Sequence, residues 1–201
     1  IRYSIFSLKI LKMKKFTKKY IKRLISSLKE TDINSVSKII KALDKTKGKI
    51  YIIGNGGSAA TASHMVNDLG AGLRRRNIKK FDVESLNDNT PVCTAIANDI
   101  GYKNIFYMQL KERIKPEDIL IAISCSGNSK NITKAVKYSK KQGAKIIGIT
   151  GFDGGKLKKK SDINFHVPTQ KNDYGLVEDM HMILNHIIYS YYINQAMTES
   201  S

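Results

Sequence analysis

Two short segments rich in glycine and serine have the composition of anion-binding loops. Gly54-Asn55-Gly56-Gly57-Ser58 follows one apolar run, and Ser124-Cys125-Ser126-Gly127-Asn128-Ser129 follows another. Glycines let a backbone turn tightly and bring amide N–H groups close to an anion, and serine hydroxyls add further donors. The three hydroxyls of the second segment suit the oxygens of a phosphate monoester. Simple turn chemistry is the alternative, because neither segment is a Walker A motif or a complete dinucleotide-binding motif.

Ionisable side chains on two expected helices have the types needed for proton transfer or metal binding. His64 and Asp68 are four residues apart, so they share one face of a helix. Glu178, His181 and His186 fall on a later helix. Imidazole and carboxylate groups suit Zn²⁺, which can act as a Lewis acid. Spacing alone does not establish a metal, and for His64 a hydrogen-bonded helix histidine is the alternative.

The elements that must position these groups alternate between strands and helices. Short apolar runs bounded by glycine or polar turns predict buried parallel strands at residues 50–53, 119–123, 145–149 and 163–167, with a weaker one near 81–83. Helical patterns lie at residues 58–69, 91–98, 104–111, 129–142 and 176–192. This alternation predicts an α/β fold with a doubly wound parallel sheet. Both glycine and serine segments then fall at the carboxyl ends of strands, where such sheets bind ligands.

The first 47 residues predict a helical hairpin. Apolar residues recur at helical spacing over residues 16–29 and 32–47, with Thr31 or Asp32 available to cap the second helix. We expect a basic N-terminal segment and first helix at 1–30, a main domain at 31–195 and a flexible tail at 196–201. Met13-Lys14-Lys15 is similar to an initiator context, so we treat residues 1–12 as upstream or added sequence.

The last expected helix predicts self-association. It is apolar on nearly every side, with Met180, Ile183, Leu184, Ile187 and Ile188 spread around it. One face of a sheet would not cover such a helix, so we expect a homo-oligomer whose core includes this helix and the N-terminal hairpin. A helix buried in the core of a monomer is the alternative.

The charge of the chain gives weak support for a nucleic-acid partner. The formal net charge is +18, but residues 1–50 hold 15 Lys/Arg against three Asp/Glu and so carry most of it. The basic residues alternate with apolar ones, as on a solvated helix face, and no aromatic platform for stacking bases accompanies them. We therefore expect no nucleic-acid partner and attribute the charge to a lysine-rich composition.

Cysteine content and hydropathy favour a cytoplasmic location. Cys93 and Cys125 are too few for a disulfide framework, and no Cys-x-x-Cys motif occurs. The apolar runs are shorter than the roughly 18–20 residues that cross a bilayer. We expect a cytoplasmic protein with no membrane partner.

Taken together, the motifs resemble the sugar isomerase (SIS) domain. The two loops and the stretch Thr94-Ala95-Ile96-Ala97-Asn98-Asp99 occur in an order and spacing similar to the phosphoheptose isomerase branch, over residues 30–195. The resemblance implies a five-stranded parallel sheet flanked by helices, and a homotetramer with a sugar-phosphate site at subunit interfaces. It also implies conversion of sedoheptulose 7-phosphate to D-glycero-D-manno-heptose 7-phosphate, a step toward the heptose of surface polysaccharide.

The same resemblance implies roles for individual residues. Aldose–ketose isomerisation moves a proton between adjacent carbons through an enediol, so it needs a base, an acid and stabilisation of an oxyanion. By resemblance, Asp68 and His186 would be the catalytic pair. One Zn²⁺ per site would be held by His64, Asp68, Glu178 and His186. The groups that would bind the substrate and its phosphate are Asn55, Gly56, Gly57, Ser58, Asn98, Asp99, Ser124, Ser126, Ser129 and Glu178.

Three positions depart from the family pattern. Asp68 stands where the family has glutamate, Glu178 where it has glutamine, and Gly72 where it has an arginine, although Arg74–Arg76 follow closely. Aspartate withdraws the carboxylate by about 1.5 Å, and a displacement of about 1 Å can cost on the order of 10²-fold in rate. Glutamate adds a negative charge that favours a bound cation. These changes favour a metal site and leave the identity of the phosphosugar open.

Three other residues are expected to be structural. We assign His166 to a strand, His181 to the core or an interface, and Cys125 no nucleophilic role, because no general base lies beside it in the sequence. For Asp99, capping a helix end is the alternative to contacting substrate hydroxyls.

Two other functions compete with isomerisation. One is a non-catalytic SIS protein that binds another protein, similar to the replication-initiator-associating factor of this family, which lacks the carboxylate four residues after the histidine. This chain keeps Asp68 together with His64, Glu178 and His186, which favours catalysis. The other is a regulatory module that senses a phosphosugar, but the first 30 residues are too few for a helix-turn-helix domain.

Overall fold

The fold comes from a computed structural model that describes residues 2–199, and the side chains of residues 7–198. The chain divides after Thr31 into two compact units, which are described separately. The first contains one helix, α1 (Arg2–Lys29). It includes the helix predicted at 16–29 and continues toward the N-terminus through residues expected to be upstream or added sequence. Its exposed apolar side chains include Phe16, Ile21 and Ile25.

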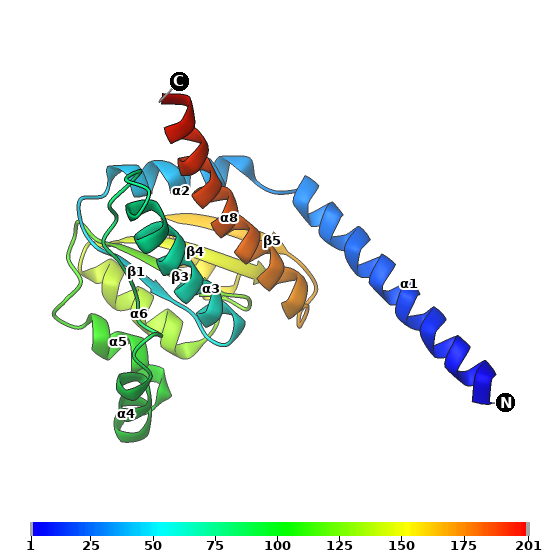
Figure 1. The fold of residues 1–201 in the computed structure, drawn as a ribbon. Coiled ribbons are helices and arrows are strands. Elements are labelled where there is room, and N and C mark those ends of the chain that lie inside the picture. Colours follow the sequence, from blue (N-terminus) through cyan, green and yellow to red (C-terminus); the bar gives the residue numbers. More distant parts are fainter. Residues whose placement is uncertain (1, 200–201) are drawn as a thin grey trace. The chain divides into compact units, whose positions relative to one another are not determined.

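The second unit is built on a five-stranded parallel sheet, as predicted (Figure 1). Its strands are β1 (Ile50–Ile53), β2 (Val83–Ser85), β3 (Ile119–Ser124), β4 (Lys145–Phe152) and β5 (Ile163–Pro168). The spatial order is β2-β1-β3-β4-β5, and every neighbouring pair is parallel. The weak strand expected near 81–83 begins at Val83, because Phe81 instead packs its buried ring 5.5 Å from that of Tyr192.

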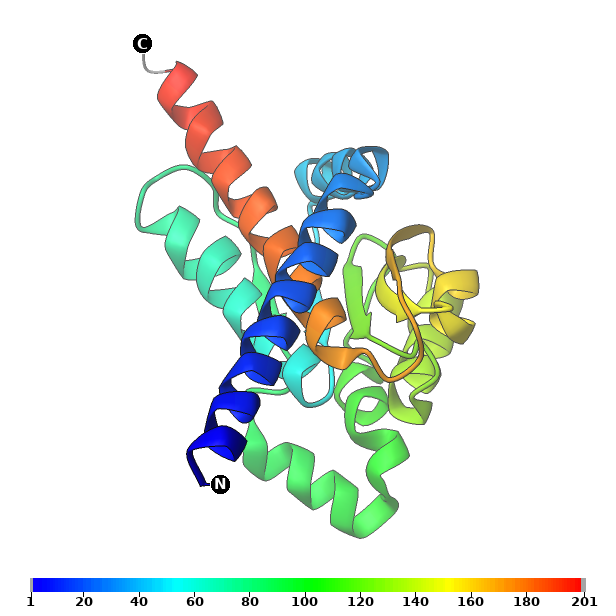
Figure 2. The ribbon, with the colours of Figure 1, turned by 90° about the vertical axis from the view of Figure 1, so that its right-hand side faces the viewer.

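Helices cover both faces of the sheet (Figures 1 and 2). One layer contacts β1, β3, β4 and β5 and consists of α2 (Ile33–Lys45), α3 (Gly57–Met65) and α8 (Tyr174–Glu199). The other contains α5 (Ile105–Leu110), α6 (Lys130–Lys141) and α7 (Gly155–Lys160). A further helix, α4 (Thr90–Ile100), precedes a short 3₁₀ turn at Tyr102–Asn104 and packs on α5. Asp32 caps α2 by accepting the Asn34 N–H over 3.0 Å.

Alternation along the strands supplies both layers with apolar side chains. Tyr51 and Ile53 of β1 belong to a buried cluster that also contains Phe106 of α5 and Ile132 of α6. Since successive side chains of a strand point to opposite faces, the intervening Ile52, which is fully buried, faces the other layer. Burial on both faces explains why the strands read as continuous apolar runs.

The chain topology brings the two predicted anion-binding loops together. β1 pairs directly with β3, with Ile53 opposite Ala122, so the loops that follow these strands leave the same edge of the sheet side by side. From this point the strand order runs outward in opposite directions, to β2 on one side and to β4 and β5 on the other. Open α/β sheets bind ligands at such a switch point.

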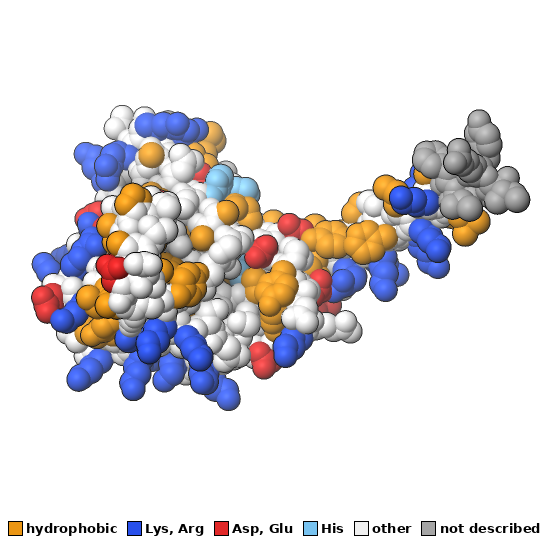
Figure 3. Space-filling view, turned by 90° about the horizontal axis from the view of Figure 1, so that it is seen from below, with side chains coloured by type: hydrophobic (Ala, Val, Ile, Leu, Met, Phe, Trp, Pro, Cys, Tyr) orange, Lys and Arg blue, Asp and Glu red, His pale blue; other side chains and the backbone are white. Residues whose placement is uncertain are grey.

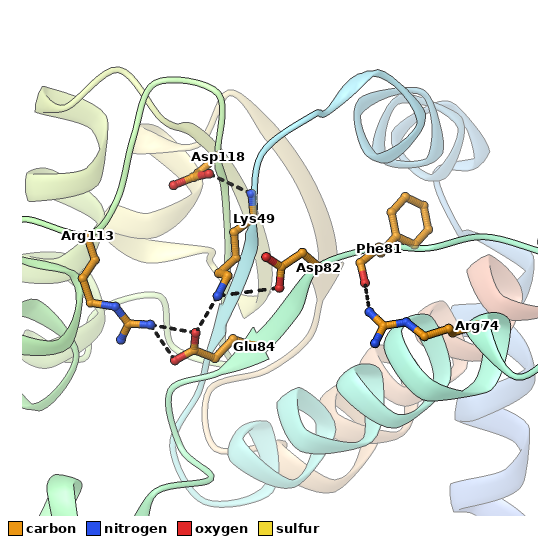
Figure 4. A network of polar contacts seen from close by, with 7 residues as sticks. All are labelled: Lys49, Arg74, Phe81, Asp82, Glu84, Arg113 and Asp118. Carbon is orange, nitrogen blue, oxygen red and sulfur yellow. Dashed lines mark hydrogen bonds and ion pairs between the residues drawn. The ribbon is translucent and has the colours of Figure 1, made fainter.

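Charged side chains attach the short edge strand β2 to its neighbours (Figure 4). Arg113 donates two hydrogen bonds to the Glu84 carboxylate, over 2.9 and 2.7 Å, and Lys49 Nζ lies 3.3 Å from it. Burial alone would raise the pKa of Glu84, but the bonds from Arg113 and Lys49 outweigh it and lower the pKa. Arg74 donates to the Phe81 carbonyl over 3.2 Å, which fixes the segment that leads into the strand.

Helix α8 continues to Glu199, through part of the segment expected as a tail, and residues 200–201 lie outside the described residues. One side of α8 is buried, including Val177, Leu184 and Ile188, while Ile187 and Tyr191 are each 41% exposed. None of the helices within residues 2–199 has the length and apolar character needed to cross a membrane. On the face seen in Figure 3, many Lys and Arg side chains lie near the margin of the folded body and histidine side chains reach the surface.

The buried histidine of α8 predicts a pH-dependent stability. His181 is 1% exposed, and burial lowers its pKa from 6.5 to about 4. Between these two values the unfolded chain binds a proton that the folded chain excludes, so the free energy of unfolding falls as the pH drops. The full effect is about 3 kcal/mol. Denaturant unfolding of wild type and His181→Gln from pH 7 to pH 4 should show a shallower pH dependence in the variant.

The matched control is His166→Gln, because His166 is only half-buried and its pKa is lowered less by burial. His166→Gln should change the pH dependence of the free energy of unfolding by much less than His181→Gln does. A slope in His181→Gln equal to that of wild type would show that other groups cause the acid sensitivity.

Candidate functional site

The two loops and the start of α8 enclose a small polar cavity of about 120 Å³. Asn55 and Ser58 of the first loop line it, together with residues 123–126 and Ser129 of the second loop, and Tyr174 and Glu178 of α8. Four of the predicted phosphate-binding serines therefore meet in one place: Ser58, Ser124, Ser126 and Ser129.

The first loop has a backbone that only glycine accommodates well. Gly56 has φ +55°, and an added Cβ at Gly57 would lie 2.4 Å from the Glu178 carboxylate. The Asn87 side chain holds the start of the loop with two hydrogen bonds. It donates to the Gly54 carbonyl over 2.8 Å and accepts the Gly54 N–H over 3.2 Å. The loop then leads directly into the N-terminus of α3, where the Ser58 and Ala59 amides donate to the Asn55 and Gly56 carbonyls over 3.0 and 2.9 Å. The positive end of the helix dipole at this terminus favours an anion.

The second loop is tightly turned and closely packed. The Ser124 hydroxyl accepts the Gly127 N–H over 3.1 Å, and the Ser126 hydroxyl accepts the Asn128 N–H over 3.3 Å. Gly127 has φ +60°, and a Cβ there would lie 2.0 Å from the Gly154 carbonyl oxygen. Ser129 is the N-cap residue of α6. The predicted glycine and serine positions therefore have separate structural roles in shaping the cavity.

Two ionisable groups in the cavity have raised pKa values. Burial, with a smaller contribution from Asp179, raises the pKa of Glu178. Burial, with a smaller contribution from Glu178, raises the pKa of Cys125 to about 11. Cys125 is therefore a neutral thiol near pH 7, in agreement with the expectation that it is no nucleophile. Glu178 places a carboxylate beside a cavity otherwise rich in hydrogen-bond donors.

A second cluster of polar groups lies further along α3 and α8. His64 Nε2 is 3.1 Å from His186 Nε2 and 3.2 Å from Asp68 Oδ2. The ligand atoms of these three residues all lie within 4.8 Å of one another. Asp68 is 6% exposed, whereas His186 is exposed and the His64 side chain is 40% exposed. The structure therefore brings together three of the four predicted metal ligands.

Asp68 lies in a helical irregularity that the sequence analysis missed. After Met65 the chain continues as a π-helical segment, Val66–Gly72, rather than as the regular helix predicted through residue 69. Such segments are rare and frequently occur at functional sites. The wider π-helical turn changes the position of Asp68 relative to His64. This position matters because the aspartate side chain is one methylene shorter than that of glutamate, so its carboxylate reaches less far.

Two asparagines hold the Asp68 carboxylate in place. Asn185, which is fully buried, donates to Asp68 Oδ2 over 2.7 Å, and Asn67 donates to Asp68 Oδ1 over 3.1 Å. Sequence reasoning missed both residues. The only available signal was their position next to Asp68 and His186.

The three-residue cluster suits a divalent cation such as Zn²⁺. Two imidazole nitrogens face each other across 3.1 Å with a carboxylate oxygen beside them, and imidazole nitrogen and carboxylate oxygen are common zinc ligands. The hydrogen bond from Asn185 to Asp68 is the kind of outer contact that orients a ligand. Among the described residues, this cluster does not include Glu178, and its role as a ligand stays a prediction.

The serine-lined cavity and the cluster of His64, Asp68 and His186 lie along one pair of parallel helices. Gly57 and Glu178 are in contact at one end, and His64 and His186 at the other, and Figure 1 shows α3 and α8 side by side. From Ser58 to His64 the helical rise is about 9 Å, and from Glu178 to His186 it is about 12 Å. One molecule with an anionic end and a reactive end could contact both places.

Two predicted substrate contacts lie elsewhere in the chain. Asn98 and Asp99 are exposed on α4 and do not line the cavity, and the Asn98 side chain donates to Asp99 over 2.9 Å. Their role in substrate binding stays a prediction.

At Gly72, a Cβ would lie 3.2 Å from the Tyr189 ring, and Arg76 instead donates to the Gly72 carbonyl.

Comparisons with known proteins identify the family of the chain. The SIS domain family matches residues 15–151 of the chain. The phosphoheptose isomerase of Helicobacter pylori strain P12 is 40% identical over 171 residues, which cover 85% of this chain and 87% of that protein. The chain belongs to the SIS domain family, in its phosphoheptose isomerase branch.

Other members of this branch match over similar lengths. The phosphoheptose isomerase of Aliarcobacter butzleri is 38% identical over 168 residues, covering 84% of this chain and 87% of that protein. Among solved structures, phosphoheptose isomerase GmhA from Neisseria gonorrhoeae has a TM-score of 0.80 at 26% identity, covering 90% of this chain and 99% of that one. The five-stranded SIS fold expected from the resemblance is thereby confirmed.

The Glu178 carboxylate should repel a phosphate bound in the cavity by a measurable amount. In Glu178→Gln, removal of one charge a few ångströms from the anion should tighten inorganic phosphate binding about fivefold near pH 8. Because the pKa of Glu178 is raised, the wild-type carboxyl loses its charge at a higher pH than an unperturbed glutamate, so the advantage of the variant should shrink as the pH falls. Calorimetric titration with phosphate at several pH values measures both effects.

Glu112→Gln is the control, since Glu112 is an exposed acid that does not line the cavity. Equal phosphate affinity in wild type and Glu178→Gln at pH 8 would show that Glu178 does not face the bound anion.

Proposed function

We propose that this protein interconverts sedoheptulose 7-phosphate and D-glycero-D-manno-heptose 7-phosphate. The observation that supports this most is the pairing of a serine-lined cavity with the His64, Asp68 and His186 cluster on one pair of parallel helices. The phosphate would occupy the cavity, and the separation of about 9 Å along α3 leaves room for a sugar chain that reaches the cluster. Membership in the phosphoheptose isomerase branch supports the choice of a seven-carbon sugar.

The proton transfer falls to groups of the cluster. In the ketose-to-aldose direction, a base removes a proton from C1, an enediol forms, and a proton is returned to C2. Asp68 and His186 are the acid–base pair in this proposal. Hydrogen bonds from Asn67 and Asn185 hold the Asp68 carboxylate at a fixed position, which a proton transfer requires.

The proposal includes one Zn²⁺ held by His64, Asp68 and His186, with Glu178 as a further ligand. When bound, the ion would polarise the sugar carbonyl and stabilise the enediolate oxygen. Glu178 and His186 are eight residues apart on α8, a rise of about 12 Å, so both cannot reach one ion from the same chain. If Glu178 is a ligand, it acts at the site of a neighbouring subunit.

That requirement favours the homotetramer with sites at subunit interfaces. Exposed apolar side chains on α8, such as Ile187 and Tyr191, and on α1, such as Phe16 and Ile21, support self-association. In this proposal the enzyme acts in the cytoplasm on a phosphorylated sugar that supplies the heptose of lipopolysaccharide or capsule, and it needs neither membrane nor nucleic acid.

Hydrogen exchange at the reacting carbon tests the proposal directly. Purified protein is incubated with sedoheptulose 7-phosphate in deuterated water, once with added zinc and once after EDTA treatment. Proton NMR should show deuterium uptake and an aldose product with zinc, and loss of both with EDTA. Exchange that survives EDTA would keep the isomerase and remove the metal from the proposal.

A different outcome would reject the substrate. If no exchange occurs while sedoheptulose 7-phosphate still raises the melting temperature, the protein acts on another sugar or only binds phosphosugars. A panel of other ketose phosphates in the same assay then separates these two cases.

The Asp68 carboxylate has a separate test. Asp68→Asn should lower kcat by at least about 10²-fold, because an amide cannot accept the proton. Inorganic phosphate affinity should stay within about twofold, since Asp68 lies outside the cavity. Asp88→Asn, which changes an exposed carboxylate beside Ser63 on α3, is the control. Unchanged turnover in Asp68→Asn would remove Asp68 from the mechanism.

A further inference from the structure

A buried pair of asparagine side chains connects the first loop to the helix that follows the second loop. Asn131 near the start of α6 is 2% exposed. Its Nδ2 donates to Asn55 Oδ1 over 2.8 Å, and Asn55 Nδ2 donates back to Asn131 Oδ1 over 3.0 Å. The two segments are 76 residues apart in the sequence. The asparagine pair therefore connects the two sides of the serine-lined cavity.

The orientation of both amides follows from one backbone group. The Ile132 N–H can only donate, and it lies 3.0 Å from Asn131 Oδ1, so that atom must be the carbonyl oxygen. The Asn131 NH₂ group then faces Asn55, which must present its own carbonyl oxygen there. The flip state of Asn55 is thus set by the helix backbone of α6 rather than by Asn55 itself.

A third residue reinforces this orientation from another element. Tyr102 lies in the 3₁₀ turn after α4, and its hydroxyl donates to Asn55 Oδ1 over 2.9 Å. The carbonyl oxygen of Asn55 therefore accepts two hydrogen bonds, which use both of its lone pairs. One of the two amide hydrogens of Asn55 is also used. The remaining hydrogen-bonding capacity of Asn55 is a single N–H donor.

We propose that Tyr102 and Asn131 are positioning residues that hold Asn55 as a hydrogen-bond donor to the phosphate of the substrate. Asn55 lines the cavity with the loop serines. A phosphate dianion accepts hydrogen bonds, so the remaining N–H suits it, whereas a flipped amide would place a carbonyl oxygen beside the anion. This inference rests on the proposed function for the identity of the ligand, and on the described contacts for the orientation.

Tyr102→Phe is the main test, because it removes only the hydroxyl of a side chain that is 57% exposed and should leave folding intact. Loss of one neutral hydrogen bond to Asn55 should raise KM for sedoheptulose 7-phosphate and Kd for inorganic phosphate about three- to tenfold, with kcat within about twofold. Tyr107→Phe is the matched control on α5, since the Tyr107 ring packs on Tyr138 and Lys134 outside this network. Its KM and Kd should equal those of wild type.

A double-mutant cycle separates positioning from a general structural role. In an Asn55→Ala background, Tyr102→Phe should cause no further rise in KM or Kd, because the group through which it acts is absent. Asn131→Asp keeps an acceptor for Ile132 but removes the donor to Asn55, so it should weaken phosphate binding about tenfold or more. An unchanged Kd in Tyr102→Phe, or an equal effect of that change with and without Asn55, would overturn the proposal.

Failure of the proposed function gives a different pattern. If wild type does not turn over sedoheptulose 7-phosphate, the substrate assignment is wrong, yet inorganic phosphate titrations of the same variants still decide whether Tyr102 and Asn131 act through Asn55. Wild type that binds no inorganic phosphate would overturn the inference itself.

Discussion

The close approach of α8 to the glycine that begins α3 is the constraint on which the site depends. At Gly57 the Glu178 carboxylate lies 2.4 Å from where a Cβ would be, so a side chain at residue 57 would displace the end of the Glu178 side chain from its place beside the cavity. That contact lies at one end of the two helices, and His64 and His186 meet at the other end. The pairing of β1 with β3 then places the second loop against the same point. These three contacts bring together the two glycine and serine loops and the ionisable groups of α3 and α8.

Much of this arrangement could be predicted from the sequence, because its signals are local. The apolar runs predicted the five strands, and the glycine and serine loops predicted where an anion would bind, since turn chemistry depends on the loop residues themselves. The i,i+4 spacing predicted that His64 and Asp68 share one helix face, and the structure places His64 Nε2 3.2 Å from Asp68 Oδ2. The SIS resemblance, carried by three short motifs, was confirmed by the comparisons and the fold.

Other features depend on tertiary contacts that no local pattern encodes. The π-helical segment around Asp68 has no signal beyond Gly70 and Gly72, and its energy is decided by packing on neighbouring elements. Asn131 and Tyr102 are ordinary polar residues in the sequence, and only the fold brings them to Asn55. The start of β2 shifted by two residues because Phe81 packs its ring on Tyr192 instead of joining the sheet. The separation of Glu178 from the three-residue cluster likewise follows from the parallel run of α3 and α8.

The burial of Cys125 has a consequence for chemistry directed at this cavity. A thiol with a pKa of about 11 holds almost no thiolate near neutral pH, and thiolate is the species that oxidants and electrophiles attack. The second glycine and serine loop should therefore keep its shape under mild oxidative stress, even though it contains a cysteine. A compound designed to occupy this cavity would gain little from a cysteine-reactive warhead. Its affinity would have to come from reproducing the charge and hydrogen-bond acceptors of a phosphate.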